Sequence, residues 1–290
     1  MNSQTSTGHT ASTPRTDRDL YRLAPTMDAV AVQAMINRLE FRATDAAYMR
    51  MSQAYFAYLP LATARNLLVL GCGTGVDVRA LRCATNASAT IVGVDHSAAL
   101  IDVARQRTAE EGLDQQVEYV VCDAHHLTFE DEQFEIVIMH TLLSHVDDPL
   151  QVLREARRVC RRGGQLAIFD GDFASLSFGY PDVDIEQQIE ATLLQLVFAN
   201  PRVMRDMPRL LSEADLELET GLGEVYADIG TGSFWANVPA VYAPILLRAD
   251  VLPATVIEDW LAYLTDALER HTFFGAANFY TYIARRARDG

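Results

Sequence analysis

The chain has 290 residues, 49% of them hydrophobic and 22% charged, which is enough for one large folded domain or two small ones. No apolar run approaches the roughly 18–20 residues that span a bilayer, and the first 19 residues lack the apolar segment of a secretory signal. The net charge of −15 disfavours a nucleic-acid partner, because proteins that bind nucleic acids present basic surfaces to the phosphates.

The N-terminal part of the chain is expected to hold a tail followed by helices. Residues 1–20 are polar and rich in Ser and Thr, so we expect a disordered tail there. Residues 21–60 are expected to form a helical cap in two pieces, ended by Pro60. The helical spacing is carried by Tyr48, Met51, Tyr55 and Leu59.

Between residues 61 and 175, short apolar runs alternate with amphipathic segments. The runs predict five strands, at 67–70, 90–95, 117–123, 134–140 and 165–170. The segments between them predict helices at about 75–82, 97–111 and 149–162, with Ser97 and Asp148 as caps and Gly163-Gly164 as the last stop. Strands that are apolar throughout and alternate with helices are typical of a parallel sheet covered on both faces.

Polar or tight-turn residues stand where each of these apolar runs stops. They are Gly71, Asp95, Asp123, His140 and Asp170. In an open parallel sheet, ligands bind beyond the carboxyl ends of the strands. We therefore interpret residues 61–175 as the core that binds a cofactor.

The pattern changes after residue 175. Helices are predicted at 184–199, 202–213, 234–250 and 254–270, the third of them broken by Pro239 and Pro244, and strands are predicted at 216–229 and 278–286. We interpret residues 176–250 as a helical insertion that covers the substrate and residues 251–290 as the last helix and strand. Because no long linker is visible, residues 21–290 are interpreted as a single domain.

The four cysteines, Cys72, Cys83, Cys122 and Cys160, form no CxxC pair, and no histidine stands at zinc-finger spacing. We expect reduced thiols, no metal site and a cytoplasmic location. Five arginines gather between residues 154 and 162, at the end of a predicted helix. We interpret this cluster as a solvated helix end, where cations favour the helix dipole.

The loop after the first strand carries glycines at alternate positions, Gly71, Gly73 and Gly75. A glycine loop between a strand and a helix brings the backbone close to a ligand at the helix N-terminus. The dinucleotide pattern GxGxxG is not met, because Val76 occupies its sixth position, and the GK[ST] of the Walker pattern is absent. A nicotinamide oxidoreductase is therefore disfavoured.

Five segments in order resemble the motifs of the class I S-adenosylmethionine-dependent methyltransferases, in the small-molecule branch that includes the quinone C-methyltransferases. The segments are LLVLGCGTGVD, IVGVDHS, VVCDAHHL, FEIVIMHTLLSHVDDPLQVLREARRVCRRGG and QLAIFD, and together they cover residues 66–173. The resemblance implies a three-layer, Rossmann-like α/β fold with a seven-stranded, mostly parallel sheet. It also implies S-adenosyl-L-methionine as the cofactor.

The same resemblance implies which residues bind the cofactor. Asp95 is expected at the ribose hydroxyls and Asp123 at the adenine amino group. As alternatives, Asp95 acts only as a helix cap and Asp123 only as a turn residue. The remaining residues implied to contact the cofactor are Gly71, Cys72, Gly73, Thr74, Gly75, His96, Ala124, His125 and His140.

A sulfonium methyl group is already activated, so most of the rate enhancement can come from positioning the acceptor. A base is needed only where the acceptor must lose a proton. The candidates for such a base are His140, His145, Asp170, Asp172 and Tyr180, together with His125, His126 and His271. His145 is expected chiefly to fix the loop beside the cofactor. Asp170 and Asp172 are expected either to face the substrate or to form a turn.

Aromatic and methionine residues of the N-terminal helices and of the 174–250 segment suit a small hydrophobic or aromatic acceptor. The alternative function is a non-methylating reaction on the same fold, such as a cyclisation or a decarboxylation. The sequence leaves open whether the protein is a monomer or a homodimer.

Overall fold

The computed structural model describes residues 29–232 and 234–288. The tail expected at 1–20 and the first part of the helical cap, 21–28, lie outside this range. The described part begins with α1 (Ala29–Thr44), α2 (Ala46–Ser52) and the 3-10 helix η3 (Ala54–Tyr58), so the helical character expected up to Pro60 is confirmed. The Asp45 side chain accepts hydrogen bonds from the first backbone N–H groups of α2, which explains why a new helix begins there.

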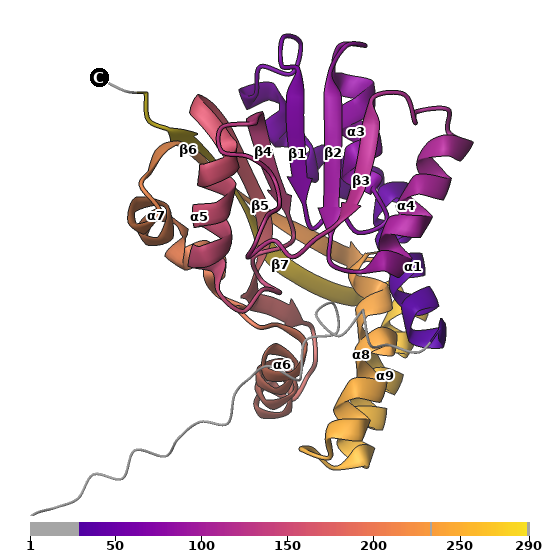
Figure 1. The fold of residues 1–290 in the computed structure, drawn as a ribbon. Helices are drawn as coiled ribbons and strands as arrows, with labels where there is room; N and C mark the ends of the chain where they lie inside the picture. The colour runs from indigo at the N-terminus through magenta and orange to yellow at the C-terminus, as the bar shows by residue number, and fades with distance from the viewer. Residues whose placement is uncertain (1–28, 233, 289–290) are drawn as a thin grey trace, which may run out of the picture.

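The seven-stranded sheet predicted from the sequence is confirmed (Figure 1). Its strands are β1 (Asn66–Leu70), β2 (Thr90–Asp95), β3 (Val117–Val121), β4 (Phe134–His140), β5 (Cys160–Phe178), β6 (Leu216–Gly230) and β7 (Phe273–Arg286). Their order in the sheet is β3-β2-β1-β4-β5-β7-β6. The first five of these strands pair in parallel, and β7 runs antiparallel to both β5 and β6.

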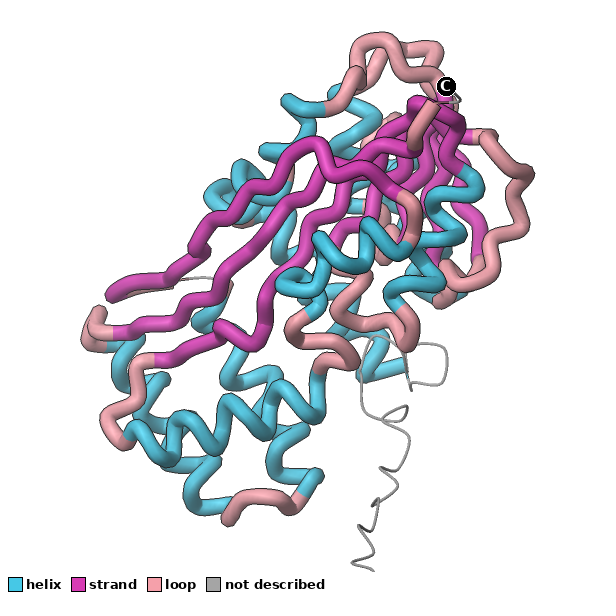
Figure 2. Tube along the Cα trace, turned by 90° about the vertical axis from the view of Figure 1, so that its left-hand side faces the viewer, coloured by secondary structure: helices cyan, strands magenta, loops and turns pink. Residues whose placement is uncertain are grey.

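Helices cover both faces of the sheet, which gives the expected three layers (Figure 2). Leu67 and Val69 of β1 pack in the same cluster as α3 (Val76–Ala84) and α4 (Ala98–Glu110). Leu68 and Leu70 point the other way, into a cluster with α5 (Pro149–Val159) and α7 (Val203–Glu213). Because successive side chains of a strand alternate between its faces, a strand buried on both sides must be apolar throughout, as β1 is.

The other helices gather beyond the carboxyl ends of the parallel strands (Figure 1). They are α6 (Val183–Val197), the 3-10 helix η4 (Trp235–Asn237), α8 (Val238–Ala249) and α9 (Ala254–Glu269). α8 packs against both α6 and α9, and the indole rings of Trp235 and Trp260 are buried among them. Within the described residues, every helix is too short or too polar to cross a membrane.

Several boundaries predicted from the sequence are wrong. α5 ends at Val159 and β5 starts at Cys160, so Gly163-Gly164 lies inside the strand and does not end the helix. Cys160 is already paired with Phe134 of β4, and this pairing outweighs the local preference of the glycines for a helix end. α8 is continuous through Pro244, although a break was expected there.

Asp170 and Asp172 also lie inside β5 and not in a turn that follows it. They pair with Tyr280 and Asn278 of β7. The sequence analysis ended the strand at residue 170, but the antiparallel partner β7 extends the ladder up to Phe178. A partner that comes from the far end of the chain leaves no trace in the local pattern around residue 170.

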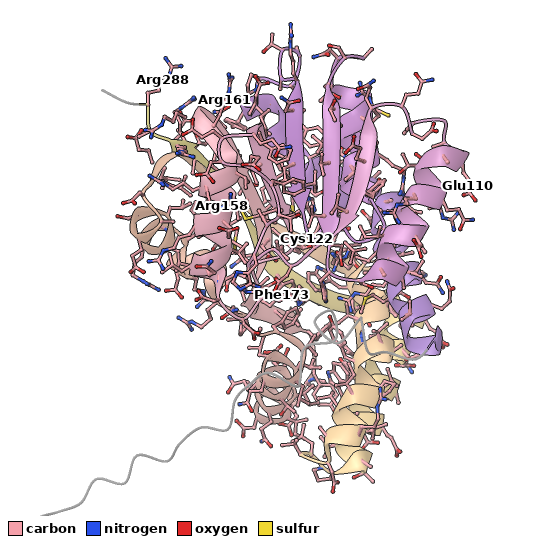
Figure 3. The ribbon with its side chains drawn as sticks, viewed as in Figure 1. Glu110, Cys122, Arg158, Arg161, Phe173 and Arg288 are labelled. Atoms are coloured by element: carbon pink, nitrogen blue, oxygen red, sulfur yellow. The ribbon has the colours of Figure 1, made fainter. Side chains whose placement is uncertain are left out.

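Arg161, from the cluster of arginines, lies toward the end of the sheet away from Cys122 and the loop after β3 (Figure 3). Four of the five arginines face carboxylates, and these include Arg158, which pairs with Asp131 at 2.8 Å, and Arg161, which pairs with Glu135 at 3.2 Å. The first of these pairs joins α5 to the segment before β4, and the second joins β5 to β4.

Candidate functional site

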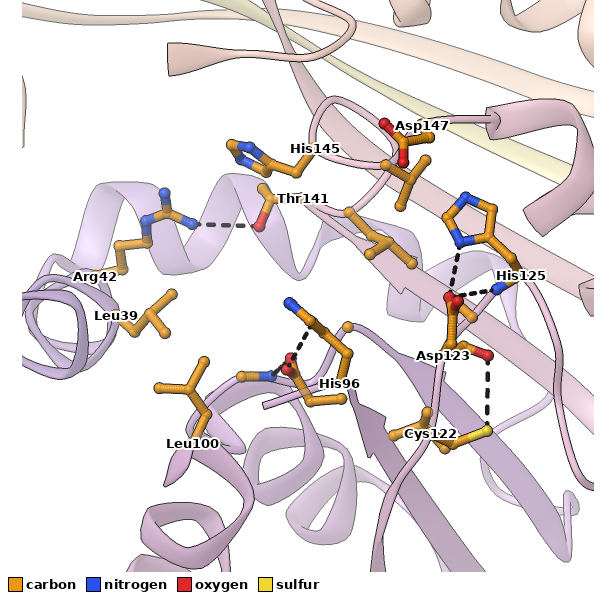
Figure 4. A pocket seen from close by; sticks show the side chains of 17 residues that line it. Leu39, Arg42, His96, Leu100, Cys122, Asp123, His125, Thr141, His145 and Asp147 are labelled. Atoms are coloured by element: carbon orange, nitrogen blue, oxygen red, sulfur yellow. Dashed lines mark hydrogen bonds and ion pairs between the residues drawn. The ribbon is translucent and has the colours of Figure 1, made fainter. Parts of the chain in front are cut away.

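A pocket of about 430 Å³ opens where the carboxyl ends of β1, β2 and β4 meet the loop after β3 (Figure 4). Its volume lies within the range usual for small-molecule sites. Its lining residues are Leu39, Arg42, Gly71, Gly73, Val94, Asp95, His96, Leu100, Cys122, Asp123, Ala124, His125, Thr141, Leu142, His145, Val146 and Asp147. Seven of the residues expected at the cofactor therefore line one pocket. They are Gly71, Gly73, Asp95, His96, Asp123, Ala124 and His125.

The loop between β1 and α3 needs its glycines for backbone conformation and for space. Gly71 has φ +68°, and a Cβ atom there would stand 2.8 Å from Cδ1 of Leu142. Gly75 has φ +80°, and a Cβ atom there would overlap the hydroxyl of Tyr119. Both positions are closed to a side chain, so the loop presents bare backbone to the pocket.

Asp95, the last residue of β2, lies under this loop and is 7% exposed. Its Oδ2 accepts a hydrogen bond from the Gly73 N–H at 2.9 Å, and its Oδ1 accepts one from the Ser97 N–H at 2.9 Å. The Nδ1 atom of His96 lies 3.3 Å from Oδ1. A carboxylate oxygen has two acceptor positions, so Asp95 can accept further hydrogen bonds from hydroxyl groups of a ligand.

Asp123 and His125 form a second polar cluster on the opposite wall of the pocket (Figure 4). Oδ1 of Asp123 accepts hydrogen bonds from the backbone N–H of His125 at 2.9 Å and from its ring Nδ1 at 2.7 Å. The other ring nitrogen, Nε2, accepts from the Asp148 N–H at 3.3 Å, which fixes His125 as the tautomer with the proton on Nδ1. Burial favours a raised pKa for Asp123, but the hydrogen bonds from His125 outweigh it and lower the pKa.

His140, the last residue of β4, lies in a small adjoining cavity of about 40 Å³, which is also lined by Cys72, Thr74 and Asp77. Its Nδ1 lies 3.2 Å from Oδ1 of Asp77 and 3.5 Å from the hydroxyl of Tyr55. Burial lowers the pKa of His140, and the nearby Asp77 carboxylate only partly offsets this effect. The lowered pKa favours the neutral imidazole.

Asp170 holds the loop after β4 and does not line the pocket. Its Oδ2 accepts from the Ser144 N–H, and its Oδ1 accepts from the Ser144 hydroxyl, both at 3.0 Å, and from the Gly171 N–H at 2.8 Å. Burial raises the pKa of Asp170, although these hydrogen bonds counter the rise. The loop fixed in this way carries His145, whose ring lies 5.5 Å from that of Phe198 and lines the pocket.

Two more candidates for a base lie away from the pocket. Asp172 is 1% exposed and pairs with Arg205 of α7 at 2.7 Å. The ring of Tyr180 stands edge-on to that of Tyr263 of α9, with 5.2 Å between the centroids. Among all the candidates, His125 and His145 line the main pocket, and His140 lines the adjoining cavity.

Sequence reasoning missed the part of the wall that comes from α1. Leu39 and Arg42 line both cavities, and Nη1 of Arg42 donates to Oγ1 of Thr141 at 3.2 Å (Figure 4). No spacing in the sequence links α1 to β4, so no local signal could have found this contact. Thr141 was within reach, because it directly follows the last residue of β4.

Comparisons with known proteins agree with this geometry. Residues 68–168 match the family model described as "Methyltransferase domain". The chain is 33% identical over 175 residues to the ubiquinone/menaquinone biosynthesis C-methyltransferase UbiE of Desulfotalea psychrophila, covering 60% of this chain and 67% of that protein. It is 29% identical over 273 residues to a 37.1 kDa protein of transposon Tn4556 in Streptomyces fradiae, covering 93% of this chain and 77% of that one.

Solved structures share the fold. A candidate methyltransferase from Bacillus halodurans C-125 aligns with a TM-score of 0.57 at 21% identity, over 81% of this chain and 98% of that one. The [4+2]-cyclase SpnF aligns with a TM-score of 0.53 at 18% identity, over 84% of this chain and 83% of that one. The family match over β1–β5 and the similarity to UbiE coincide with the glycine loop and the acidic residues that follow the strands. The chain therefore belongs to the class I S-adenosylmethionine-dependent methyltransferases.

Proposed function

We propose that the protein transfers a methyl group from S-adenosylmethionine to a small hydrophobic or aromatic acceptor. The observation that carries the proposal is the position of Asp95, a nearly buried carboxylate beneath a bare glycine loop. A ligand that follows this loop meets two carboxylates, Asp95 and Asp123, on opposite walls of one pocket (Figure 4).

The residues present fit S-adenosylmethionine. Leu142 fills the space that a Cβ atom of residue 71 would need, so residue 71 is a glycine and a ligand beside it meets only backbone. Asp95 would hold the ribose hydroxyls, and Asp123 would accept from the adenine amino group. Asp77, in the first turn of α3, lines the adjoining cavity and would face the cationic methionine end. Carboxylates at this end suit a ligand that carries an ammonium and a sulfonium group.

When bound, the cofactor supplies an electrophilic methyl group, and transfer forms the acceptor–methyl bond as the methyl–sulfur bond breaks. The protein's part is mainly to position the acceptor and exclude water. Leu39, Leu142 and Val146 supply apolar walls for that purpose. Where the acceptor must lose a proton, His145 is the base that we propose, because it lines the main pocket. His125 lines the same pocket, but its two ring nitrogens already bond to Asp123 and to the Asp148 N–H.

A second function is a reaction that keeps the cofactor but transfers no methyl group. It is suggested by the [4+2]-cyclase among the proteins of the same fold. The two functions differ in product, because methyl transfer converts one S-adenosylmethionine into S-adenosylhomocysteine for each acceptor molecule that is methylated. Mass spectrometry of the cofactor after incubation with acceptor mixtures separates them.

The test of the cofactor site is calorimetric titration with S-adenosylhomocysteine. We expect wild type to bind and Asp95→Asn to lose about 1.5–3 kcal/mol, the usual cost of a lost hydrogen bond to a charged group. Asp102→Asn, on the exposed face of α4, is the matched control and should bind as wild type does. Thermal unfolding of both variants shows whether the fold is kept. No binding to the wild-type protein would overturn the proposal.

A further inference from the structure

The segment that follows β3 is attached to α5, and His125 carries this attachment to the pocket. The backbone N–H of Leu127 donates to the Glu155 side chain at 2.9 Å, and the Gln151 side chain donates to the carbonyl oxygen of His125 at 3.1 Å. Glu155 and Gln151 both belong to α5. His125 itself lines the pocket of about 430 Å³, so its contacts with α5 determine where its imidazole lies.

The two ring nitrogens of His125 have different partners. Nδ1 donates to Oδ1 of Asp123 at 2.7 Å, and Nε2 accepts from the Asp148 N–H at 3.3 Å. Figure 4 shows the first of these contacts on the wall of the pocket. Asp148 is the N-cap of α5, and its side chain accepts from the Gln151 N–H at 3.0 Å. The imidazole therefore joins a carboxylate of the pocket to the start of a helix.

The Asp123 carboxylate depends on this contact for its orientation. Its side chain is 57% exposed, and an exposed side chain moves among rotamers unless bonds hold it. Oδ1 accepts both from the ring Nδ1 of His125 and from the His125 backbone N–H, the latter at 2.9 Å. Among the residues that the structure describes, none donates to Oδ2. The second oxygen is therefore the one that remains for a ligand.

The charge of Asp123 makes Oδ2 an acceptor only. Burial favours a raised pKa for Asp123, but the hydrogen bonds from His125 outweigh it and lower the pKa. The group is therefore ionised near neutral pH. An ionised carboxylate accepts hydrogen bonds and donates none, so Oδ2 suits an amino group at the edge of a planar base.

We propose that His125 is a positioning residue, which holds Oδ1 of Asp123 so that Oδ2 meets the amino group of the adenine ring. This inference rests on the proposed methyltransferase function, in which Asp123 accepts from that amino group. His125 takes its own position from Asp148 and Gln151, so recognition of the base depends on the first turn of α5.

The first experiment measures what the amino group adds to binding. S-Adenosylhomocysteine is compared with its purine analogue, in which a hydrogen atom replaces the amino group of adenine. We expect calorimetry on the full chain to show at least about ten-fold tighter binding of S-adenosylhomocysteine, since a hydrogen bond to a charged group is gained. The ratio of the two dissociation constants, analogue over S-adenosylhomocysteine, is called the amino preference.

Three variants show whether His125 sets the amino preference. His125→Phe keeps a ring but loses both ring hydrogen bonds, so the amino preference should fall about three-fold, because Asp123 must then be ordered by the ligand. His125→Asn places an amide N–H near the position of Nδ1 and should restore most of the preference. His126→Phe is the matched control, because His126 is exposed and does not line the pocket, and it should keep the wild-type value.

Asp123→Asn tests the orientation directly. Because His125 donates to the oxygen at the Oδ1 position, the amide must place its N–H groups at the position of Oδ2. These groups would face the amino group of adenine, donor against donor. We expect the amino preference to invert, so that the purine analogue binds more tightly than S-adenosylhomocysteine. In Asp123→Asn/His125→Phe only the backbone N–H of residue 125 still holds the oxygen, and the inversion should shrink.

The tautomer of His125 is measured without any ligand. NMR of the ring nitrogens in the full chain should place the proton of neutral His125 on Nδ1, and the signal is identified by its loss in His125→Asn. A proton on Nε2 would overturn the inference. Thermal unfolding shows whether each variant is folded. If His125→Phe does not fold, the sign of the amino preference in Asp123→Asn decides the question.

Failure of this inference can be told apart from failure of the proposed function. If S-adenosylhomocysteine binds but the amino group makes no difference, or His125→Phe keeps the full amino preference, the role of His125 is refuted while the cofactor site stands. The same conclusion follows if Asp123→Asn still prefers S-adenosylhomocysteine. If the wild-type chain does not bind S-adenosylhomocysteine at all, the proposed function and this inference fail together.

Discussion

Glu40 of α1 and Arg79 of α3 form an ion pair, with 3.0 Å between Oε2 and Nη2. The Arg79 side chain is 7% exposed, and its Nη1 donates to the carbonyl oxygen of Thr74 at 2.7 Å. One arginine therefore connects the helix that covers the pocket to the glycine loop below it. Its Nε also pairs with Glu111, just beyond the end of α4, at 2.8 Å.

Arg79→Met should loosen this connection. We expect the free energy of unfolding to fall by about 1–3 kcal/mol, because hydrogen bonds to a charged group are lost. The affinity for S-adenosylhomocysteine should fall as well, since Thr74 loses its anchor. Urea unfolding and calorimetry measure the two effects. The control is Arg270→Met, which removes an exposed pair with Asp266 and should cost less than about 0.5 kcal/mol.

A glycine can be required by its backbone conformation or by a lack of space for a Cβ atom. Gly75 and Gly112 allow these two reasons to be tested separately. Both have positive φ, +80° and +68°, but a Cβ atom on Gly112 would have no heavy atom within 4 Å, whereas one on Gly75 would meet Tyr119. Gly112→Ala should therefore cost only backbone strain, about 1–2 kcal/mol. Gly75→Ala should cost more than that, at least about 3 kcal/mol.

A double variant tests the origin of the extra cost. Tyr119→Phe removes the hydroxyl that the new Cβ atom would meet, along with its hydrogen bond to Thr108. Gly75→Ala should therefore cost less in the Tyr119→Phe background than in wild type, as measured by chemical unfolding. An equal cost in both backgrounds would show that the hydroxyl does not set the cost, which would then come from backbone strain and from the contacts with Ala104 and the ring of residue 119.

Asp170 is expected to be a positioning residue for the loop after β4. Asp170→Ala removes three hydrogen bonds to a buried carboxylate and should destabilise the fold by about 3–5 kcal/mol. Ser144→Ala keeps the two backbone bonds and should cost only about 0.5–1.5 kcal/mol. Affinity for S-adenosylhomocysteine should follow the same order, since this loop lines the pocket. Similar losses for both variants would contradict the assigned role.

The raised pKa of Glu190 predicts how the stability of the fold depends on pH. Burial raises its pKa to about 7, although a hydrogen bond from the Phe178 N–H acts in the opposite direction. Glu186, one turn earlier on α6, shares a hydrogen bond with it and adds to the rise. The pKa of Glu190 in the folded protein is above the usual 4.5. The contribution of protonated Glu190 to the free energy of unfolding is therefore complete below pH 4.5 and is lost as the pH rises through 7.

Glu190→Gln should therefore remove part of the pH dependence of stability. A glutamine keeps the acceptor for Phe178 and cannot ionise, so the variant should gain melting temperature relative to wild type at pH 8 but not at pH 4.5. The exposed Glu258→Gln on α9 serves as the control and should show the wild-type profile. Parallel melting curves for wild type and Glu190→Gln across this range would refute the prediction.

The part of the pocket that lies beyond the strands was largely predictable, because its polar residues stand at strand ends. Asp95 ends β2 and Asp123 stands two residues after β3, so a parallel sheet brings both to one edge. The position of His140 follows by the same rule. In each case a local pattern, an apolar run followed by a polar residue, was sufficient.

The rest depended on contacts between distant parts of the chain. Arg42 reaches the pocket only because α1 packs over the glycine loop, and no motif encodes that packing. Asp170 and Asp172 were expected either to face the substrate or to form a turn, because they stand at an apparent strand end. In the structure one anchors the loop of Ser144, and the other is paired with Arg205 from a helix that sequence reasoning could not orient.

The place of β7 between β5 and β6 sets the order in which the molecule can be made. β6 has a single neighbour in the sheet, and that neighbour, β7, is the last of the seven strands to leave the ribosome. Every strand and loop around Asp95 and Asp123 has emerged by residue 150, whereas the pairing of β6 with β7 comes later. A growing chain can thus form the pocket around Asp95 and Asp123 before β6 joins the sheet.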